Sequence, residues 1–373
     1  MTNAFARPDS TRTRGDRHLS AWLIAATLIQ ITYIPGPGSV SAAVRDPIPI
    51  LAYYYIWFDV SSWDRAKIDY PLLGRYSSDD ANVMRQHIQW AKEAGIDGFI
   101  VSWKSTQKLN RRLEQIIELA EKEDFKLVII YQGLDFERNP RPVRRIAADL
   151  DYFIGHYAAH EALYLFEKPV VIWSGTWKFS REEIASVTEE RRDDLLILAS
   201  EKNTKGYERL ADIVDGDAYY WSSVNPETFP GYVEKLKAMG EVIHANAGLW
   251  IAPAAPAFDA RLIGGKTVVA RNDGETLRKE MNTALQSSPD AIGLISWNEF
   301  SENSHIEPSE NYSHRYLEIL SDFNGAISPA IGGSDSNQTG NTMQKLDGSR
   351  ATALGIILAL IIMGLVMVAR RNY

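Results

Sequence analysis

Eight short apolar segments recur between residues 48 and 299, and each has the length and composition of a buried β-strand. They are rich in β-branched and aromatic residues, and stretches with helical spacing separate them. Because parallel strands are joined by crossover connections, this alternation predicts a parallel sheet covered by helices. The eight segments are 48–57, 98–103, 126–132, 169–175, 195–200, 217–222, 248–253 and 293–299.

Eight strand–helix units favour an α/β fold of the closed (β/α)8, or TIM-barrel, type. A doubly wound open sheet is the competing interpretation, but it usually has fewer strands and a glycine-rich phosphate turn, and no G-x-G-x-x-G follows any of the eight segments. Helix signals agree with the alternation. Gly95 fits the end of a first helix, Ser180 with Glu183 forms a capping box, and Asn225 followed by Pro226 fits the start of a later helix.

Both ends of the chain read as targeting segments. Residues 1–43 combine arginines, an apolar run and small residues, which predicts a signal peptide, with an uncleaved signal anchor as the alternative. Residues 351–369 carry no charge and are long enough to cross a bilayer, so they predict a transmembrane anchor followed by a cytoplasmic tail, 370–373. A sorting tail that is later removed would look similar.

The remaining sequence divides into a linker and one domain. Residues 326–350 are rich in Gly, Ser, Asn and Thr and predict a flexible linker, which leaves 45–325 as a single barrel domain. The expected location is the cell membrane, with a single span and the barrel outside the cytoplasm. The chain has no cysteine, which excludes disulfides, a thiol nucleophile and a thiolate metal site. Its net charge of −8 argues against nucleic acid as a partner.

The segment ISWNEFSENSHIEP, residues 295–308, places Glu299 at the end of the eighth predicted strand and Glu302 three residues later. Active sites of TIM barrels lie at the carboxyl ends of the strands, and glycosidic bond cleavage uses two carboxyl groups. Two close acids also raise one another's pKa, so one can stay protonated near neutrality. The alternative is that both are ion-pair partners or solvated loop acids. Their spacing alone leaves the stereochemical outcome open.

Two neighbours of this pair have two interpretations each. Asn298 either binds substrate or forms structural hydrogen bonds, and His305 either contacts a sugar or is a satisfied loop histidine. Glu302, His305 and Glu307 lack the i, i+4 spacing of a helical zinc motif, so we expect neither a metal site nor a cofactor.

Aromatic residues recur where the predicted strands end. The chain has 10 Trp and 17 Tyr, and flat rings with a polar edge suit the faces of sugars. Any one of these rings could instead fill the core. A long aromatic loop, 58–76, also follows the first strand and is typical of a functional connection. The residues predicted to bind substrate with Asn298 and His305 are Tyr54, Trp57, Trp103 and Tyr220.

Five segments together resemble glycoside hydrolase family 99 and its close relatives. They are YYYIW, GRYSSDDANVMRQHIQWAKEAGIDGFIVSW, APAAPAFDARLI, ARNDGETLRKEMNTAL and SWNEFSENSHIEP, and they extend from the first to the eighth strand. The resemblance implies a (β/α)8 barrel that acts as a retaining endo-α-1,2-mannosidase or mannanase without a metal. It also implies that Glu299 is the base on the substrate's own 2-hydroxyl and that Glu302 is first acid and then base at the leaving oxygen.

The sequence departs from the family at three positions. Phe300 stands where Trp is usual, Asn303 where Gly is usual, and Gln132 where we expect an acid in mannan-acting members. The leading hypothesis is a membrane-anchored glycoside hydrolase that takes a polysaccharide or oligosaccharide of α-mannosidic or related type. The alternatives are a catalytically silent carbohydrate-binding envelope protein and another barrel glycosidase, such as an α-1,3-glucanase.

Overall fold

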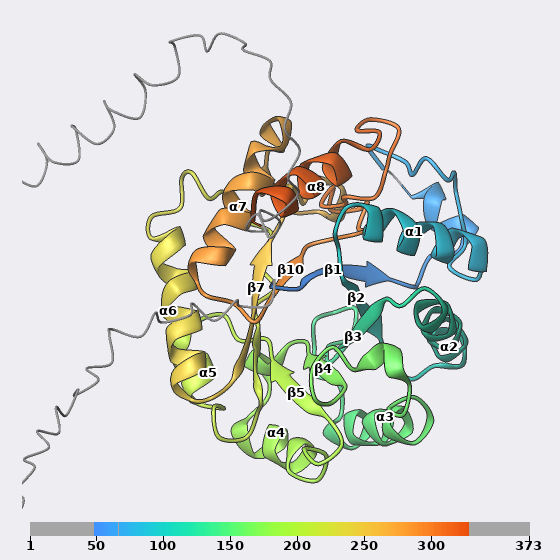
Figure 1. Cartoon of the computed structure of the whole chain (residues 1–373). Helices are drawn as coiled ribbons and strands as arrows, with labels where there is room; N and C mark the ends of the chain where they lie inside the picture. The colour runs from blue at the N-terminus through green and yellow to red at the C-terminus, as the bar shows by residue number, and fades with distance from the viewer. Residues whose placement is uncertain (1–47, 66, 328–373) are drawn as a thin grey trace, which may run out of the picture. The chain divides into compact units, whose positions relative to one another are not determined.

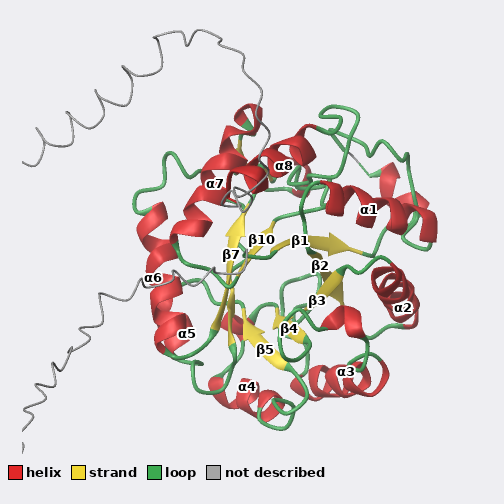
Figure 2. Ribbon diagram, viewed as in Figure 1, coloured by secondary structure: helices red, strands yellow, loops and turns green. Residues whose placement is uncertain are grey.

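A computed structural model describes residues 48–65 and 67–327 and contains a closed barrel of eight parallel strands. The strands follow one another around the barrel in the order β1, β10, β7, β6, β5, β4, β3, β2, and helices surround them (Figures 1 and 2). The predicted TIM barrel is therefore confirmed. The strands are β1 (Ile50–Tyr55), β2 (Gly98–Trp103), β3 (Lys126–Tyr131), β4 (Val170–Trp173), β5 (Leu196–Ala199), β6 (Gly216–Ala218), β7 (Leu249–Ala254) and β10 (Ala291–Leu294).

The helices begin and end where local side chains satisfy free backbone groups. Asp80 accepts a hydrogen bond from the backbone of α1, Gly95 has the positive φ of a left-handed cap, and the predicted capping box of Ser180 and Glu183 is present. The helices are α1 (Ala81–Glu93), α2 (Gln107–Lys122), α3 (Val143–His156), α4 (Arg181–Thr188), α5 (Thr204–Glu208), α6 (Tyr232–Ala245), α7 (Glu275–Gln286) and α8 (Arg315–Ile327).

Two layers of apolar side chains hold the barrel together, and the strand pleat assigns residues to them. On β1, Leu51 and Tyr53 belong to the cluster inside the barrel, whereas Ala52 and Tyr54 belong to the layer under the helices. Full burial of one large apolar side chain stabilises a fold by about 1.5–3 kcal/mol. Strands that are buried on both faces therefore contribute twice to the core.

Several details differ from the sequence prediction. The eighth barrel strand, β10, ends at Leu294 instead of residue 299. Helix α6 begins only at Tyr232, because Pro230 lacks a backbone donor and Gly231 caps the helix, and Asn225 begins a separate turn. A small antiparallel hairpin of β8 (Phe258–Asp259) and β9 (Val268–Val269) is inserted between β7 and α7.

The predicted segments at the chain ends fall mainly outside the described residues. This applies to the signal peptide, 1–43, to the transmembrane helix, 351–369, to the tail, 370–373, and to the linker beyond residue 327. Helix α8 extends to Ile327, two residues past the predicted end of the domain. No helix within residues 48–65 and 67–327 is long and apolar enough to cross a membrane.

Candidate active site

Glu299 and Glu302 lie on the irregular segment that follows β10, at the carboxyl end of the barrel. The backbone N–H of Glu299 donates to Ser296 Oγ at 2.8 Å, and its carboxylate accepts from the N–H of Ser301 at 3.0 Å. The carbonyl of Glu302 accepts from the N–H of Asp259 at 2.7 Å, which ties the pair to the β8–β9 hairpin. Glu299 is 8% exposed and Glu302 is half-buried.

The electrostatics of the pair favour retention of one proton near neutrality. Burial raises the pKa of Glu299 to about 7, and the charge of Glu302 adds to the rise, whereas the hydrogen bond from Ser301 and the charge of Lys67 oppose it. Burial also raises the pKa of Glu302, against the charge of Arg138. Since each proton affects both groups, the pair titrates as a unit. This proton sharing is what acid–base catalysis by two carboxyl groups requires.

Three aromatic side chains lie next to the pair. The hydroxyl groups of Tyr55 and Tyr220 are 2.7 Å apart, and the ring of Tyr55 stacks on Trp57 with 4.3 Å between centroids. Burial and then the charges of Glu299 and Glu302 raise the pKa of Tyr55, so both carboxylates act on its hydroxyl. Trp57 is 39% exposed, so one wall of the site presents an open ring. The structure thus brings the predicted residues Trp57 and Tyr220 to the pair.

Two other predicted aromatics lie elsewhere. Tyr54 is buried under α1, where its hydroxyl is 3.0 Å from Nδ1 of His87, and Trp103 is fully buried with Nε1 donating to Asn110 at 3.0 Å. Both side chains face the helix layer because they occupy the outward positions of the pleat. The predicted substrate contacts of Tyr54 and Trp103 do not fit this placement. Tyr55, one position further on, is the residue that the sequence analysis missed.

Asn298 fastens the end of β1 to the catalytic segment. Its Oδ1 accepts from the backbone N–H of Tyr55 at 2.8 Å, and its Nδ2 donates to the Tyr55 carbonyl at 3.0 Å and to the Tyr76 hydroxyl at 3.3 Å. The side chain is fully buried. Because the amide is fully buried and bonded to β1 and Tyr76, the structure favours the structural interpretation of Asn298 over a contact with sugar.

His305 is also a structural residue. Its Nε2 is 3.0 Å from Asp69 Oδ2, and its ring stacks on Phe300 at 3.9 Å. Burial, reinforced by the charge of Arg271 and opposed by Asp69, lowers the pKa of His305 to about 4. The ring is therefore neutral at pH 7. It fastens the long β1 loop to the catalytic segment, which does not fit the predicted contact with sugar.

Glu307, Asn303 and the β1 loop complete the surroundings of the pair. Glu307 turns away from His305 and accepts hydrogen bonds from Tyr76 at 2.9 Å and from His87 at 3.0 Å. Asn303, where the related family has Gly, has a φ of +50°, a conformation that Asn tolerates better than most residues. The β1 loop contains the 3-10 helix η1 (Val60–Asp64) and brings Lys67 Nζ to 3.1 Å from Ser301 Oγ.

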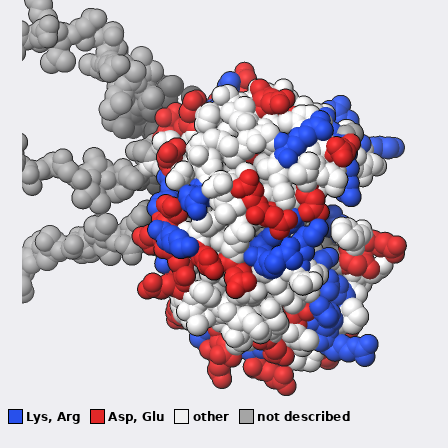
Figure 3. All heavy atoms as spheres, turned by 90° about the vertical axis from the view of Figure 1, so that its right-hand side faces the viewer, with Lys and Arg blue, Asp and Glu red and all other residues white. Residues whose placement is uncertain are grey.

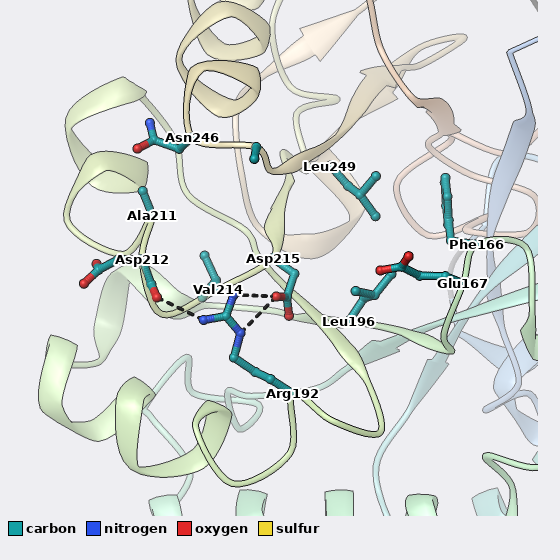
Figure 4. Close-up of a pocket in the computed structure, with 11 residues that line it drawn as sticks. Phe166, Glu167, Arg192, Leu196, Ala211, Asp212, Val214, Asp215, Asn246 and Leu249 are labelled. Atoms are coloured by element: carbon teal, nitrogen blue, oxygen red, sulfur yellow. Dashed lines mark hydrogen bonds and ion pairs between the residues drawn. The ribbon is translucent and has the colours of Figure 1, made fainter. Parts of the chain in front are cut away.

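A separate cavity of about 540 Å³ lies at the other end of the barrel, where Leu196 and Leu249 begin β5 and β7 (Figure 4). Its most prominent polar group, Arg192, is already engaged. The guanidinium donates to Asp215 Oδ1 at 2.6 Å and to the carbonyl of Asp212 at 2.9 Å. This end of a TIM barrel serves stability, so the cavity is not the candidate catalytic site.

Comparisons with known proteins agree with this geometry. The chain is 23% identical over 279 residues to the human and mouse glycoprotein endo-alpha-1,2-mannosidase-like proteins, and this match covers 67% of the chain and about 60% of each relative. The rat glycoprotein endo-alpha-1,2-mannosidase is 22% identical over 263 residues, 64% of the chain and 56% of that protein. The chain thus spans less than two thirds of these curated relatives.

A solved structure supports the same fold. The GH99 endo-alpha-mannosidase from Bacteroides thetaiotaomicron superimposes with a TM-score of 0.67 at 20% identity, over 75% of this chain and 98% of that one. The model of glycosyl hydrolase family 99 matches residues 57–322, from the loop after β1 into α8. Since this match includes Glu299, Glu302 and most of the barrel, the chain belongs to glycosyl hydrolase family 99.

Proposed function

We propose that this chain is a glycoside hydrolase that cleaves α-mannosidic or related linkages inside a polysaccharide, with Glu299 and Glu302 as its catalytic pair. The observation that carries the proposal is a buried Glu299, whose pKa is about 7 and is affected by the charge of the half-buried Glu302, beside stacked aromatic rings at the carboxyl end of the barrel. The names of the matched relatives favour an α-mannoside as substrate.

The proposed reaction has two steps. In the first, the carboxylate of Glu299 takes the proton of the sugar's 2-hydroxyl, the 2-oxygen attacks C1 to form a 1,2-anhydro sugar, and Glu302 protonates the departing oxygen. In the second, Glu302 takes a proton from water, the water oxygen attacks C1, and Glu299 returns its proton to the 2-oxygen. Two inversions at C1 give retention. The enzyme begins and ends with one proton on the pair, and the reaction uses the form in which Glu302 holds that proton.

Activity should be highest when the pair of glutamates carries one proton. Below both pKa values the base is protonated, and above about pH 7 the pair loses the proton that the acid must donate, so kcat/KM should peak between these limits. Lys67 lowers the pKa of Glu299. The Lys67→Met variant should therefore move the alkaline limb of the pH profile to higher pH.

This pH prediction is checked by measuring kcat/KM from about pH 5 to 9 for the wild type and Lys67→Met. Lys122→Met removes one charge from the outer surface of α2 and serves as the control. An alkaline limb that stays in place or moves to lower pH in Lys67→Met would show that Lys67 does not act on the catalytic pair.

The proposed function is tested by incubating the full chain with α-mannan and related α-glycans. We expect release of oligosaccharides whose new reducing ends have the α-anomeric form in the first proton NMR spectra. The Glu299→Gln/Glu302→Gln double variant should bind these glycans but release nothing. Binding without turnover by the wild type would instead favour a carbohydrate-binding protein, and products from α-1,3-glucan alone would identify a glucanase.

We also propose that the barrel is held at the outer face of the cell membrane by residues 351–369. The support is the charge-free composition of that segment, the two arginines after it, and the export signal expected in residues 1–43. Intact cells that express the full chain should lose the barrel to added protease, and the chain should fractionate with membranes. Protection of the barrel in intact cells would contradict this orientation.

A further inference from the structure

Several loops at the carboxyl end of the barrel carry basic side chains that form no ion pair with any carboxylate in the described part of the chain. Lys104 follows β2, Arg138 lies after β3, Lys202 follows β5, and Lys235 lies in the first turn of α6 after β6. Within residues 48–65 and 67–327, none of these four forms an ion pair. The charge of Arg138 lowers the pKa of Glu302, so this guanidinium acts on the catalytic pair.

Other basic groups of the described residues are paired with acids. Arg112 contacts both Asp59 and Asp79 at 2.6 Å, and Arg145 contacts Asp149 at 2.8 Å. On the side formed by α1, α2 and α3, basic and acidic side chains lie next to one another (Figure 3). The chain as a whole has a net charge of −8. The four cations at the carboxyl end of the barrel thus belong to a chain whose net charge is negative.

Three of the four cations lie against aromatic rings. Nζ of Lys202 is 3.9 Å from the centroid of Trp177, Nζ of Lys235 is 4.4 Å from that of Trp221, and Nζ of Lys104 is 5.1 Å from that of Phe136. Every lysine–aromatic contact of this kind among the described residues belongs to one of these lysines. Each contact offers a flat apolar surface and an ammonium group together, which is the combination that an acidic sugar requires.

The acids of the β3 loop form no ion pair with Arg138 among the described residues. Asp135 shares the β3 loop with Arg138, but its carboxylate accepts from the backbone N–H groups of Glu137 and Asn139 at 2.9 and 2.8 Å. Glu137 is exposed and forms no ion pair in the described part of the chain. Burial lowers the pKa of Lys104 and of Lys235, so both ammonium groups lack part of their hydration. An anionic group of a ligand would form hydrogen bonds with these ammonium groups in place of the water that burial has removed.

We propose that the glycan taken by this site is acidic, with carboxylate or phosphate groups that meet Lys104, Arg138, Lys202 and Lys235 while the rings beside the lysines contact the sugar faces. The inference rests on the proposed glycosidase function, because it names the substrate class of the same site. Cations on four different loops would contact several sugar units of one chain, which suits cleavage inside a polymer.

The test compares substrates that share one backbone and differ in charge. Neutral α-mannan is compared with the same mannan after oxidation of its 6-hydroxyls to carboxylates, and phosphomannan is compared with its dephosphorylated form. We expect kcat/KM of the full chain to be about tenfold higher or more on an acidic member, mainly through KM, and this preference to shrink at about 0.5 M salt because exposed charges are screened. A preference for one acidic form over the other identifies the group.

Two matched variants locate the effect. The Lys202→Gln/Lys235→Gln variant should bring the ratio of acidic to neutral kcat/KM towards one. Lys122→Gln/Lys279→Gln removes two charges from the exposed sides of α2 and α7 and should keep the wild-type ratio. Thermal melting of all variants checks that the fold is intact.

The outcomes separate this inference from the proposed function. Cleavage of neutral and acidic mannans at equal rates overturns the inference and keeps the glycosidase. If no member of the set is cleaved, the proposed function fails, and binding to the Glu299→Gln/Glu302→Gln variant then decides the inference. Equal affinity of that variant for the neutral and acidic forms would overturn it, whereas tighter binding of an acidic form would support it.

Discussion

Replacing Glu302 with Gln lowers kcat/KM on α-mannan by about 10³- to 10⁴-fold, and replacing Glu299 with Gln has an effect of similar size. General acid–base groups typically contribute about 10²- to 10⁴-fold, and the burial of Glu299 and the partial burial of Glu302 limit the access of water that could replace them. Gln keeps the size of each side chain and removes only its ability to exchange a proton. Initial rates of oligosaccharide release measure both effects.

The effects of the two substitutions should differ when the leaving group needs no proton. On a substrate with a dinitrophenolate leaving group, Glu302→Gln should release that group in the first turnover at a rate near that of the wild type. Glu299→Gln should remain inactive, because the 2-hydroxyl still has to lose its proton before it can attack C1. A stopped-flow measurement of the first turnover distinguishes the roles.

Glu310→Gln is the matched control for these variants. Glu310 is an exposed glutamate on the same stretch of chain, so its replacement makes the same change in charge outside the site. Its kcat/KM should stay within about twofold of the wild type. Rescue of Glu299→Gln by the activated leaving group, with none for Glu302→Gln, would reverse the assigned roles, and rescue of neither would end the acid assignment of Glu302.

The barrel was predictable because its strands are buried on both faces and read as apolar runs. The same apolar character made the end of the last strand difficult to predict. Ile295 and Trp297 are as buried as the residues of β10, but their N–H groups bond to Ala254 and Tyr53 in an irregular segment, so apolar character continues after the regular pairing has stopped. Apolar content reports burial, and pairing depends on partners that are distant in sequence.

The site was predictable only where chemistry is visible in the residue type. Two glutamates at the end of the last strand are unusual enough to be noticed, whereas three consecutive tyrosines on β1 do not reveal which one faces the barrel interior. In a strand that is buried on both faces, no alternation of polar and apolar residues shows which side chains face the barrel interior. The sequence analysis therefore favours Tyr54 instead of Tyr55. The hydrogen bond of His305 is not visible in the sequence, because its partner, Asp69, lies 236 residues away.

Replacing Asn298 with Ala should lower the free energy of unfolding by about 2–5 kcal/mol, because it leaves the buried N–H and C=O of Tyr55 without partners. The end of β1 would then move relative to the catalytic segment, and kcat should fall along with stability. Denaturant unfolding and steady-state kinetics measure the two effects. Asn282→Ala, on the exposed side of α7, should change the unfolding free energy by less than about 1 kcal/mol.

Asn298→Asp separates the structural role from a role in binding sugar. Aspartate keeps the acceptor for the Tyr55 N–H but turns a second oxygen, in place of the amide donor, towards the Tyr55 carbonyl. If Asn298 fastens β1, this variant should be about as unstable as Asn298→Ala, and more so as pH rises and the buried carboxyl group ionises. If Asn298 bound substrate instead, both variants would unfold like the wild type and only KM would increase, which would contradict the structural assignment.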